Sequence, residues 1–276
     1  MRRLALVGVT AALGFLVAAA ALAGPAGQYV LITGDQENAW VVQGTGVVGT
    51  WSTAPYAPYP VAVLGTILTT GSTSGNQGAE YTLAGVPTGT LFTNGLPGGH
   101  EAWDATTDGT NIYVIDWTTG NVTRLDMTWS NPQVLFSPGA AGTYLGITYD
   151  PTNNSLWVAG WTTGTIADYT LTGTPLSSFT VPFAALTCLA MDYSDNTLWF
   201  GSQSTEGTFY QYSRAGASLG TQAYPALAAQ NTLGGEFALS ATPREPIPAA
   251  SPAVLLLLAV LIAGAGLALL HRRAGA

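Results

Sequence analysis

A short strand with a large aromatic residue at its centre recurs at nearly constant spacing along the second half of the chain. Tyr113, Trp157 and Trp199 hold the same place in three such strands, separated by steps of 44 and 42 residues. A period of about 40 to 50 residues is typical of folds built from repeated supersecondary units. The chain is therefore constrained to an array of similar units that pack against one another.

Each repeat holds four short segments with strand character, in the same order. The first strands are expected at residues 102–105, 145–149 and 188–192, the third at Val122, Ile166 and Phe209, and the fourth at Phe136, Phe179 and near Tyr224. Aromatic and β-branched residues dominate these segments, and charged residues are too sparse for a polar helical face. Four antiparallel strands in a repeat of this length predict the blades of a β-propeller.

The first half of the chain follows the same rule with a less regular phase. Segments 39–42 and 80–83 align with the central strands of the later repeats as second strands. Residues 63–70 can then serve as the first strand of the second unit. Two further units are therefore predicted ahead of the three regular ones.

The last of these strand-like segments has no partner after it in sequence. Residues 235–240 have the pattern of a first strand, and the strands near Val30, Val41 and Val48 lack one. Pairing of the two would make the N-terminal strands the second to fourth of one blade and would remove exposed sheet edges. The sequence thus predicts an all-β propeller of five four-stranded blades over residues 24–243, with six blades or a β-sandwich as alternatives.

One block of the repeat region resembles a known blade type. Residues 146–182, GITYDPTNNSLWVAGWTTGTIADYTLTGTPLSSFTVP, are similar to the NHL-like and related propeller blades of exported bacterial proteins. The resemblance implies a type of blade but no activity, because such blades occur in hydrolases, lyases and plain binding proteins.

The N-terminus has the layout of a secretory signal peptide. Arg2 and Arg3 precede an apolar run over residues 4–22, and the small residues Ala21 and Ala23 precede Gly24. A cationic head, an apolar middle and small residues at positions −3 and −1 predict a helical signal peptide over 1–23 with cleavage before Gly24. An uncleaved membrane anchor is the alternative.

A second apolar segment lies near the C-terminus. Residues 253–270 contain no charge and, as a helix, would span about 27 Å, enough to cross a bilayer. The tail 271–276 contains Arg272 and Arg273, and cationic residues stay on the cytoplasmic side. The sequence therefore predicts a transmembrane helix whose N-terminal side is exported.

The segment before this helix resembles a bacterial sorting signal. Glu245, Pro246, Ile247 and Pro248 lie within the linker 244–252, and the order of motif, helix and Arg pair is similar to the PEP-CTERM and IPTL-CTERM families of Gram-negative bacteria. That resemblance implies cleavage by an exosortase and transfer from the inner membrane to the outer surface or medium. Two departures, Arg244 in place of proline and alanines at 249–250, leave a permanent periplasmic anchor as the alternative.

The charge of the middle region limits its partners. Residues 24–243 carry fourteen acidic and two basic residues, a net charge of −12, and the chain contains no lysine. Such a surface repels nucleic acids and anionic lipids. Nucleic acid is therefore not expected as a partner, whereas neutral glycans and divalent cations remain compatible.

No catalytic motif accompanies these features, so we expect a binding or structural protein and not an enzyme. Trp117 and Trp161 stand at turn positions and are the candidates for contact with a glycan or another extracellular ligand. The alternative is a metal-dependent hydrolase or lactonase in which Glu101 and Glu236, each near the start of a first strand, hold Ca²⁺. Otherwise no cofactor is expected. The lone Cys188 is interpreted as a buried apolar residue.

Overall fold

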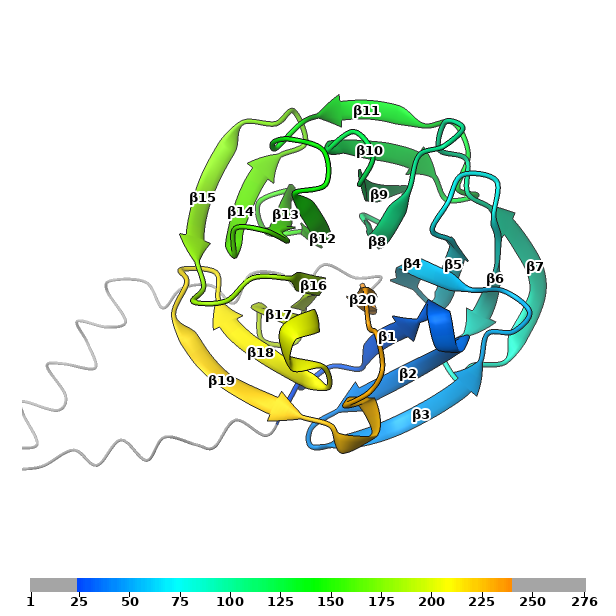
Figure 1. The fold of residues 1–276 in the computed structure, drawn as a ribbon, viewed down its shortest axis with the longest axis horizontal. Helices are drawn as coiled ribbons and strands as arrows, with labels where there is room; N and C mark the ends of the chain where they lie inside the picture. Colours follow the sequence, from blue (N-terminus) through cyan, green and yellow to red (C-terminus); the bar gives the residue numbers. More distant parts are fainter. Residues whose placement is uncertain (1–23, 240–276) are drawn as a thin grey trace, which may run out of the picture. The chain divides into compact units, whose positions relative to one another are not determined.

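Twenty strands form five four-stranded antiparallel sheets around a central axis in the part of the chain that the computed structural model describes, residues 24–239 (Figure 1). From the axis outward, blade 1 consists of β20 (Gly234–Phe237), β1 (Tyr29–Thr33), β2 (Asn38–Gln43) and β3 (Gly46–Ser52), blade 2 of β4 (Pro58–Leu64), β5 (Thr66–Gly71), β6 (Gln77–Thr82) and β7 (Pro87–Thr93), and blade 3 of β8 (Ala102–Thr107), β9 (Asn111–Asp116), β10 (Asn121–Asp126) and β11 (Gln133–Phe136). Blade 4 consists of β12 (Tyr144–Asp150), β13 (Ser155–Gly160), β14 (Thr165–Thr170) and β15 (Pro175–Thr180), and blade 5 of β16 (Leu186–Asp192), β17 (Thr197–Ser202), β18 (Thr208–Ser213) and β19 (Ser218–Ala223). The predicted five-bladed, all-β propeller is confirmed.

The ring closes by pairing strands from the two ends of the described chain. β20 pairs antiparallel with β1, with Glu236 opposite Val30. Gly234 is needed here because a Cβ atom at this position would lie 1.8 Å from the main-chain oxygen of Tyr59. The predicted closure by a lone C-terminal strand is confirmed, and β1, β2 and β3 are the second to fourth strands of blade 1.

Blade 2 corrects the strand assignment made from sequence. The stretch 63–70 is not one strand, because it contains the end of β4 and most of β5. Gly65, with φ of 58°, forms the turn between them, a conformation that glycine adopts without steric cost. Residues 80–83 consequently belong to the third strand, β6, and its turn, and 39–42 likewise lie in the third strand of blade 1, β2.

Large side chains fill the space between blades. Tyr113, Trp157 and Trp199, the residues that define the repeat, are each 1% exposed. Trp157 packs in the same apolar cluster as Phe200, across the boundary between blades 4 and 5. The repeated aromatic position therefore serves the packing of neighbouring blades.

The outer edges of the blades are free of charge. None of β3, β7, β11, β15 and β19 contains a charged residue, although charged side chains are a common protection of exposed edges. In every blade the register shifts between the third and fourth strands. Such bulges bend and twist the edge strand, which discourages pairing with another flat edge.

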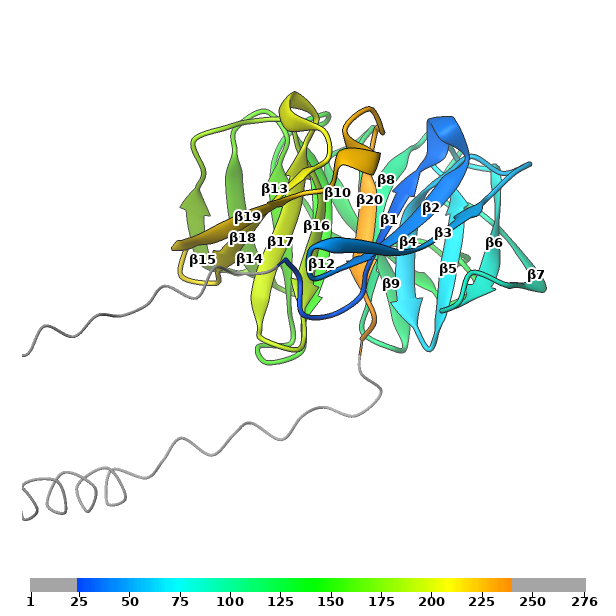
Figure 2. The same cartoon turned by 90° about the horizontal axis from the view of Figure 1, so that it is seen from below.

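The two faces of the ring differ in what they carry. We call the face at which the five inner strands begin the top face, and the opposite face the bottom face. The 3-10 turns η1 (Gly34–Gln36), η2 (Gln203–Thr205) and η3 (Pro225–Leu227) lie on the top face, as the edge-on view shows (Figure 2). Leu239, the last described residue, lies at the bottom face, where its N–H donates to the carbonyl of Val63.

Several predictions concern residues outside the described range. They are the signal peptide 1–23 with Ala21 and Ala23, the linker 244–252 with its motif Glu245–Pro248, the helix 253–270 and the tail 271–276 with Arg272 and Arg273. Among residues 24–239, no helix is long and apolar enough to cross a membrane.

Candidate functional site

Four aromatic side chains gather around the axis at the top face. Tyr59 and Trp103 are the second residues of β4 and β8, and Trp117 and Trp161 begin the turns after β9 and β13. Ring centroids lie 5.1 Å apart for Tyr59 and Trp103 and 6.0 Å apart for Trp117 and Trp161, both pairs edge to face. We call the mouth cluster the set formed by these rings and the two buried leucines on which they pack: Tyr59, Trp103, Trp117, Trp161, Leu145 and Leu233.

Local sequence explains why the tryptophans reach this face. Trp117 and Trp161 each begin a Trp-Thr-Thr-Gly turn whose glycine, Gly120 or Gly164, has φ of 75° or 66°. These left-handed glycines reverse the chain within four residues. The indole ring before them is only partly buried, so it contributes both to the packing and to the accessible surface.

Polar side chains complete the ring of the mouth on the side of blades 5 and 1. Gln203 follows β17 at the position that Trp117 and Trp161 hold in their blades, and its Nε2 donates to Oδ1 of Asn231 at 2.6 Å. The Tyr59 hydroxyl accepts from the main-chain N–H of Asp35 at 3.1 Å. Burial, with the nearby Asp35 charge, raises the pKa of Tyr59 to about 12, so this hydroxyl stays neutral. The mouth thus combines aromatic faces with uncharged hydrogen-bonding groups.

Sequence reasoning found only part of this site. It named Trp117 and Trp161, which the structure brings into contact, but it missed Tyr59, Trp103 and Gln203. Tyr59 and Trp103 share a position, the second residue of an inner strand. Trp103 could have been found from its place in the predicted first strand 102–105, whereas the strand assigned to blade 2, 63–70, did not include Tyr59. Gln203 is a polar residue at an otherwise aromatic repeat position, a break in the pattern that also points to the site.

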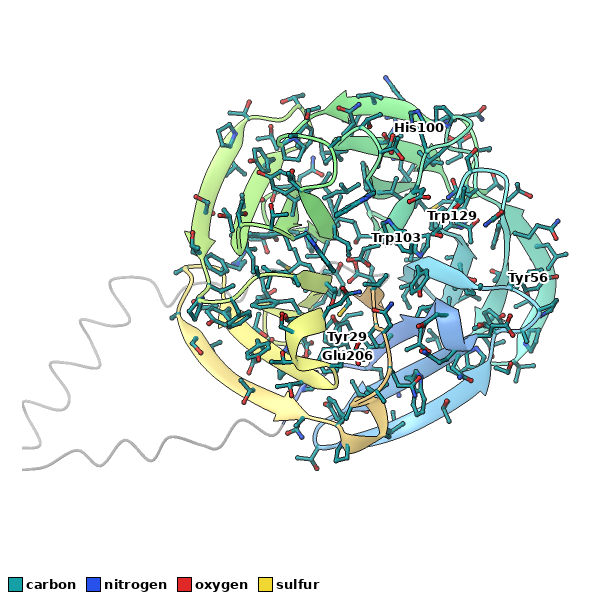
Figure 3. The ribbon with its side chains drawn as sticks, in the orientation of Figure 1. Tyr29, Tyr56, His100, Trp103, Trp129 and Glu206 are labelled. Carbon is teal, nitrogen blue, oxygen red and sulfur yellow. The ribbon has the colours of Figure 1, made fainter. Side chains whose placement is uncertain are left out.

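His100 lies beside the mouth without joining the cluster. Its Nδ1 is 2.6 Å from Oδ2 of Asp116, a carboxylate that also accepts from the N–H of Thr118 and the hydroxyl of Thr119. Trp103 lies nearer the centre of the ring than His100 (Figure 3). The histidine therefore joins the turn after β9 to the segment that enters β8.

The axis below the mouth holds two buried carboxyl groups. Asp104 accepts from the main-chain N–H groups of Ala105, Ile147 and Gly235, each at 3.0 Å, and so joins three inner strands. Glu236 contacts the hydroxyl of Thr148 at 3.1 and 3.3 Å. Burial raises the pKa of Asp104 well above its usual range and that of Glu236 to about 8.

The predicted calcium ligands do not come together as a site. Glu101 precedes β8, where it forms a bridge with Thr73, whereas Glu236 lies inside β20 against Thr148. Across residues 24–239, no three His, Cys, Asp or Glu side chains group in a way that could hold a metal ion. A calcium site needs about six to eight converging oxygen ligands. The oxygens of Asp104 already accept three main-chain hydrogen bonds. Asp104, Glu101 and Glu236 therefore do not fit such a site.

Cys188 has the surroundings of a packing residue. It is fully buried in the same cluster as Tyr29 and Phe237, and its Sγ lies 3.3 Å from the Thr187 hydroxyl. Burial raises its thiol pKa to about 11. A neutral, buried thiol is a poor nucleophile.

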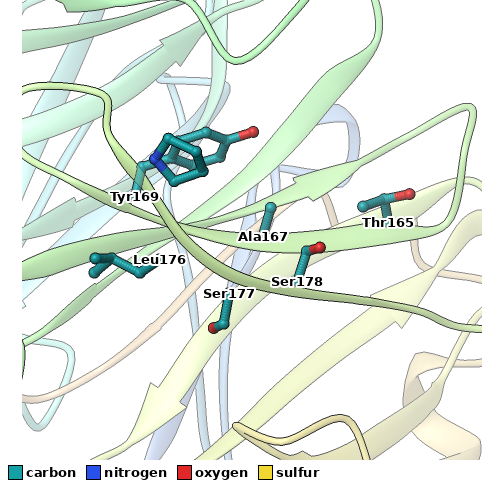
Figure 4. A pocket seen from close by; sticks show the side chains of 7 residues that line it. Thr165, Ala167, Tyr169, Leu176, Ser177 and Ser178 are labelled. Atoms are coloured by element: carbon teal, nitrogen blue, oxygen red, sulfur yellow. The ribbon is translucent and has the colours of Figure 1, made fainter.

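Two shallow hollows lie on the outer parts of the blades. One lies over β14 and β15 and includes Tyr169 and Leu176 (Figure 4). The other, on blade 1 beside the β6–β7 turn, includes Val48, Trp51 and Leu83. Neither is lined by a charged side chain, and neither gathers aromatic rings from several blades as the mouth does. The mouth is therefore the better candidate.

Comparison with known proteins agrees with the fold. A chain in the crystal structure of the nidogen/laminin complex is similar over 77% of this chain and 98% of its own length, with 14% identity and a TM-score of 0.53. Two others, with TM-scores of 0.46 and 0.45, are a Bacteroides caccae protein of unknown function (14% identity; 71% of this chain and 72% of that one) and a catalytically inactive virginiamycin B lyase from Staphylococcus aureus with quinupristin (17% identity; 73% and 67%). The search of curated proteins finds no match.

A family model gives the more specific result. The SMP-30/gluconolactonase/LRE-like region matches residues 58–204, from the start of β4 to η2. This match spans blades 2 to 4 and half of blade 5, more than half of the 276-residue chain. The chain therefore belongs to the SMP-30/gluconolactonase/LRE-like family.

Proposed function

We propose that this protein is an exported binding protein without catalytic activity, which recognises neutral glycans through the mouth of its propeller. The observation that carries the proposal is the mouth cluster, where Trp103, Trp117 and Trp161 are only partly buried. Aromatic faces offer broad, rigid apolar contact at little entropic cost. Gln203 and Asn231 add amides that can exchange hydrogen bonds with sugar hydroxyls.

The charge of the surroundings favours a neutral ligand. The two arginines of the described residues, Arg124 and Arg214, pair with Gln133 and Asp150 near the bottom face. Asp35, Glu101 and Asp116 lie beside the mouth cluster on the top face. An anionic polymer would meet like charge there, whereas a neutral chain of hydroxyl groups would not.

Export and sorting are part of the same proposal. They rest on the signal-peptide pattern at 1–23 and on the resemblance of residues 244–276 to an exosortase-type sorting signal. β20 begins beside Leu233 in the mouth cluster, and Leu239 beyond it bonds to Val63 at the bottom face. Leu239, the last described residue, thus lies on the face opposite the mouth.

Binding is tested by titrating the purified chain with cello-, malto- and xylohexaose in a calorimeter. We expect measurable affinity for at least one of them and its loss in Trp117→Ala and Trp161→Ala. Trp51→Ala, a partly buried tryptophan on the outside of blade 1, is the matched control and should bind like the wild type. Equal affinity of all four proteins, or no heat with any hexaose, would count against the glycan proposal.

Sorting is tested by intact mass of the protein from inner-membrane, outer-membrane and medium fractions of the native host. A species that begins at Gly24 and ends near Glu245, found outside the inner membrane, would support processing. A species that keeps Arg273 in the inner membrane would support a permanent anchor instead.

Family membership favours one alternative, a metal-dependent hydrolase of the lactonase type. It is tested by lactone hydrolysis with and without Ca²⁺, together with thermal unfolding in Ca²⁺. A calcium-dependent rise in the unfolding temperature that is lost in Glu101→Gln and Glu236→Gln would favour the enzyme over the binding protein.

A further inference from the structure

The strand that closes the ring carries a carboxyl group with no positive charge near it. Glu236 is 1% exposed and is the third residue of the four-residue strand β20. None of the five inner strands, β4, β8, β12, β16 and β20, contains Lys, Arg or His. An ionised carboxylate in this position would be buried without a counter-charge, which is costly.

The contacts of Glu236 tie the closing strand to the opposite side of the ring. Its oxygens meet the Thr148 hydroxyl of β12, and Oε1 also accepts from the N–H of Phe237 at 2.9 Å. Thr148 in turn accepts from the N–H of Met191 in β16. One carboxyl group therefore joins blade 1 to blade 4 and, through Thr148, to blade 5.

Burial opposes a negative charge on Glu236, whereas the donors Thr106, Thr148 and the Phe237 N–H favour one, and the balance raises its pKa. Asp104 from β8 pins Gly235 of the closing strand, Tyr29 lies on the paired strand β1, and Tyr193 follows β16. β4 contains no charged residue, Asp150 at the end of β12 is paired with Arg214, and Asp192 at the end of β16 accepts from the N–H of Gly27. A charge on Glu236 would thus be buried close to a second acid, Asp104.

We propose that protonated Glu236 is a latch that holds β20 in the ring, and that loss of this proton loosens the junction between the two ends of the propeller. The latch is short, since only four residues of β20 pair with β1. A four-residue strand gains little from pairing alone. Release of β20 would open blade 1 on the side of the axis.

The direction of the pH effect follows from linkage. Burial raises the pKa of Glu236 to about 8, above the value of an exposed carboxyl group. The closed ring then holds one proton more than the open form between the two pKa values, so closure is most stable in mild acid and weakens as pH rises toward about 8. One proton corresponds to a change of up to about tenfold in the closing equilibrium for each pH unit in this window.

The test is hydrogen–deuterium exchange of the full chain in detergent, read by mass spectrometry at pH values from 5.5 to 8.5. Peptides covering β20 should lose protection by about threefold to tenfold per pH unit after correction for intrinsic exchange. Peptides covering β13, in the middle of blade 4, should keep theirs. In Glu236→Gln, which keeps the shape and cannot ionise, protection of β20 should not change with pH.

Glu80→Gln is the matched control, because Glu80 lies on β6 and bonds to Thr66 and Thr88 near the surface. It should behave like the wild type. The proposal fails if β20 in the wild type keeps constant protection across this range, or if Glu236→Gln loses protection in parallel with the wild type. The first outcome needs no variant, so a Glu236→Gln protein that fails to fold would leave the test decisive.

Discussion

The axis and the mouth of the propeller are both built from side chains of several blades, but they use those side chains differently. At the axis, Asp104 and Glu236 are buried, and their oxygens bond to main-chain groups and to Thr148. At the mouth, Trp117 and Trp161 are partly exposed, and only their apolar surface is used in packing. The axis therefore holds the ring together, while the mouth keeps surface available for another molecule.

The difference matters for choosing a functional site, because the acidic candidate residues lie at the axis and the aromatic candidates lie at the mouth. Carboxyl groups usually attract attention as functional groups, yet buried acids with perturbed pKa values also occur in structural networks. All three hydrogen bonds that Asp104 accepts come from main-chain groups of inner strands. We therefore propose that the mouth serves recognition, whereas the acidic axis holds the inner strands together.

The largest effect is expected from removing the centre of the axis. Asp104→Ala leaves the N–H groups of Ile147 and Gly235 buried without an acceptor, each of which costs about 1 to 3 kcal/mol. We expect the free energy of unfolding to fall by about 3 to 5 kcal/mol, measured by denaturant titration. Asp104→Asn, which keeps one acceptor oxygen, should lose less. Wild-type stability in Asp104→Ala would mean that the axis does not hold the ring.

A smaller loss is expected at the next contact along the axis. Thr148→Val keeps the shape of the side chain but removes the acceptor for the Met191 N–H and the partner of Glu236. We expect a loss of about 1 to 3 kcal/mol in the free energy of unfolding. Thr162→Val, on the exposed turn after β13, is the control and should change stability by less than about 0.5 kcal/mol. Equal effects of the two changes would contradict the special role of the axis.

The sequence predicted the packing between blades better than the contacts around the central axis. Blades 3 to 5 could be predicted because Tyr113, Trp157 and Trp199 must fill the same gap between neighbouring blades, and that need repeats with the chain. Blade 2 was assigned wrongly because Gly65 interrupts an otherwise continuous apolar stretch and converts one expected strand into a hairpin. A single glycine inside a strand pattern is a weak signal.

The residues of the mouth could be predicted from sequence only in part. Trp117 and Trp161 could be selected because turn positions are visible in the sequence. The contact of Tyr59 with Trp103 depends on two inner strands meeting around an axis, and nothing in their spacing along the chain encodes that distance. For the same reason Glu101 and Glu236 looked similar in sequence but lie in different surroundings once the ring closes.

A direct comparison of tryptophans sharpens the contrast between mouth and core. Trp199→Ala removes a ring that is 1% exposed and should lower the free energy of unfolding by about 3 to 5 kcal/mol. Trp117→Ala removes a partly buried ring and should cost only about 1 to 2 kcal/mol, since less apolar area leaves the packing. Denaturant titration of both variants measures the difference. If Trp117→Ala were as damaging as Trp199→Ala, the mouth would have to be regarded as an extension of the core.

The smallest effect on stability, and the sharpest separation of the two roles, is expected at Gln203. Its amide bonds to Asn231 on the partly exposed rim, so Gln203→Ala should change the free energy of unfolding by less than about 0.5 kcal/mol. The same change removes a hydrogen-bonding group from the mouth and should weaken binding of a responsive hexaose about threefold to tenfold, the equivalent of one hydrogen bond. Calorimetric titration beside thermal unfolding gives both quantities on one sample. A large fall in the free energy of unfolding with unchanged affinity for the hexaose would contradict this prediction. Gln203 would then have a structural role like that of the axis residues, because it would stabilise the contact between blades 5 and 1 and would not bind the ligand.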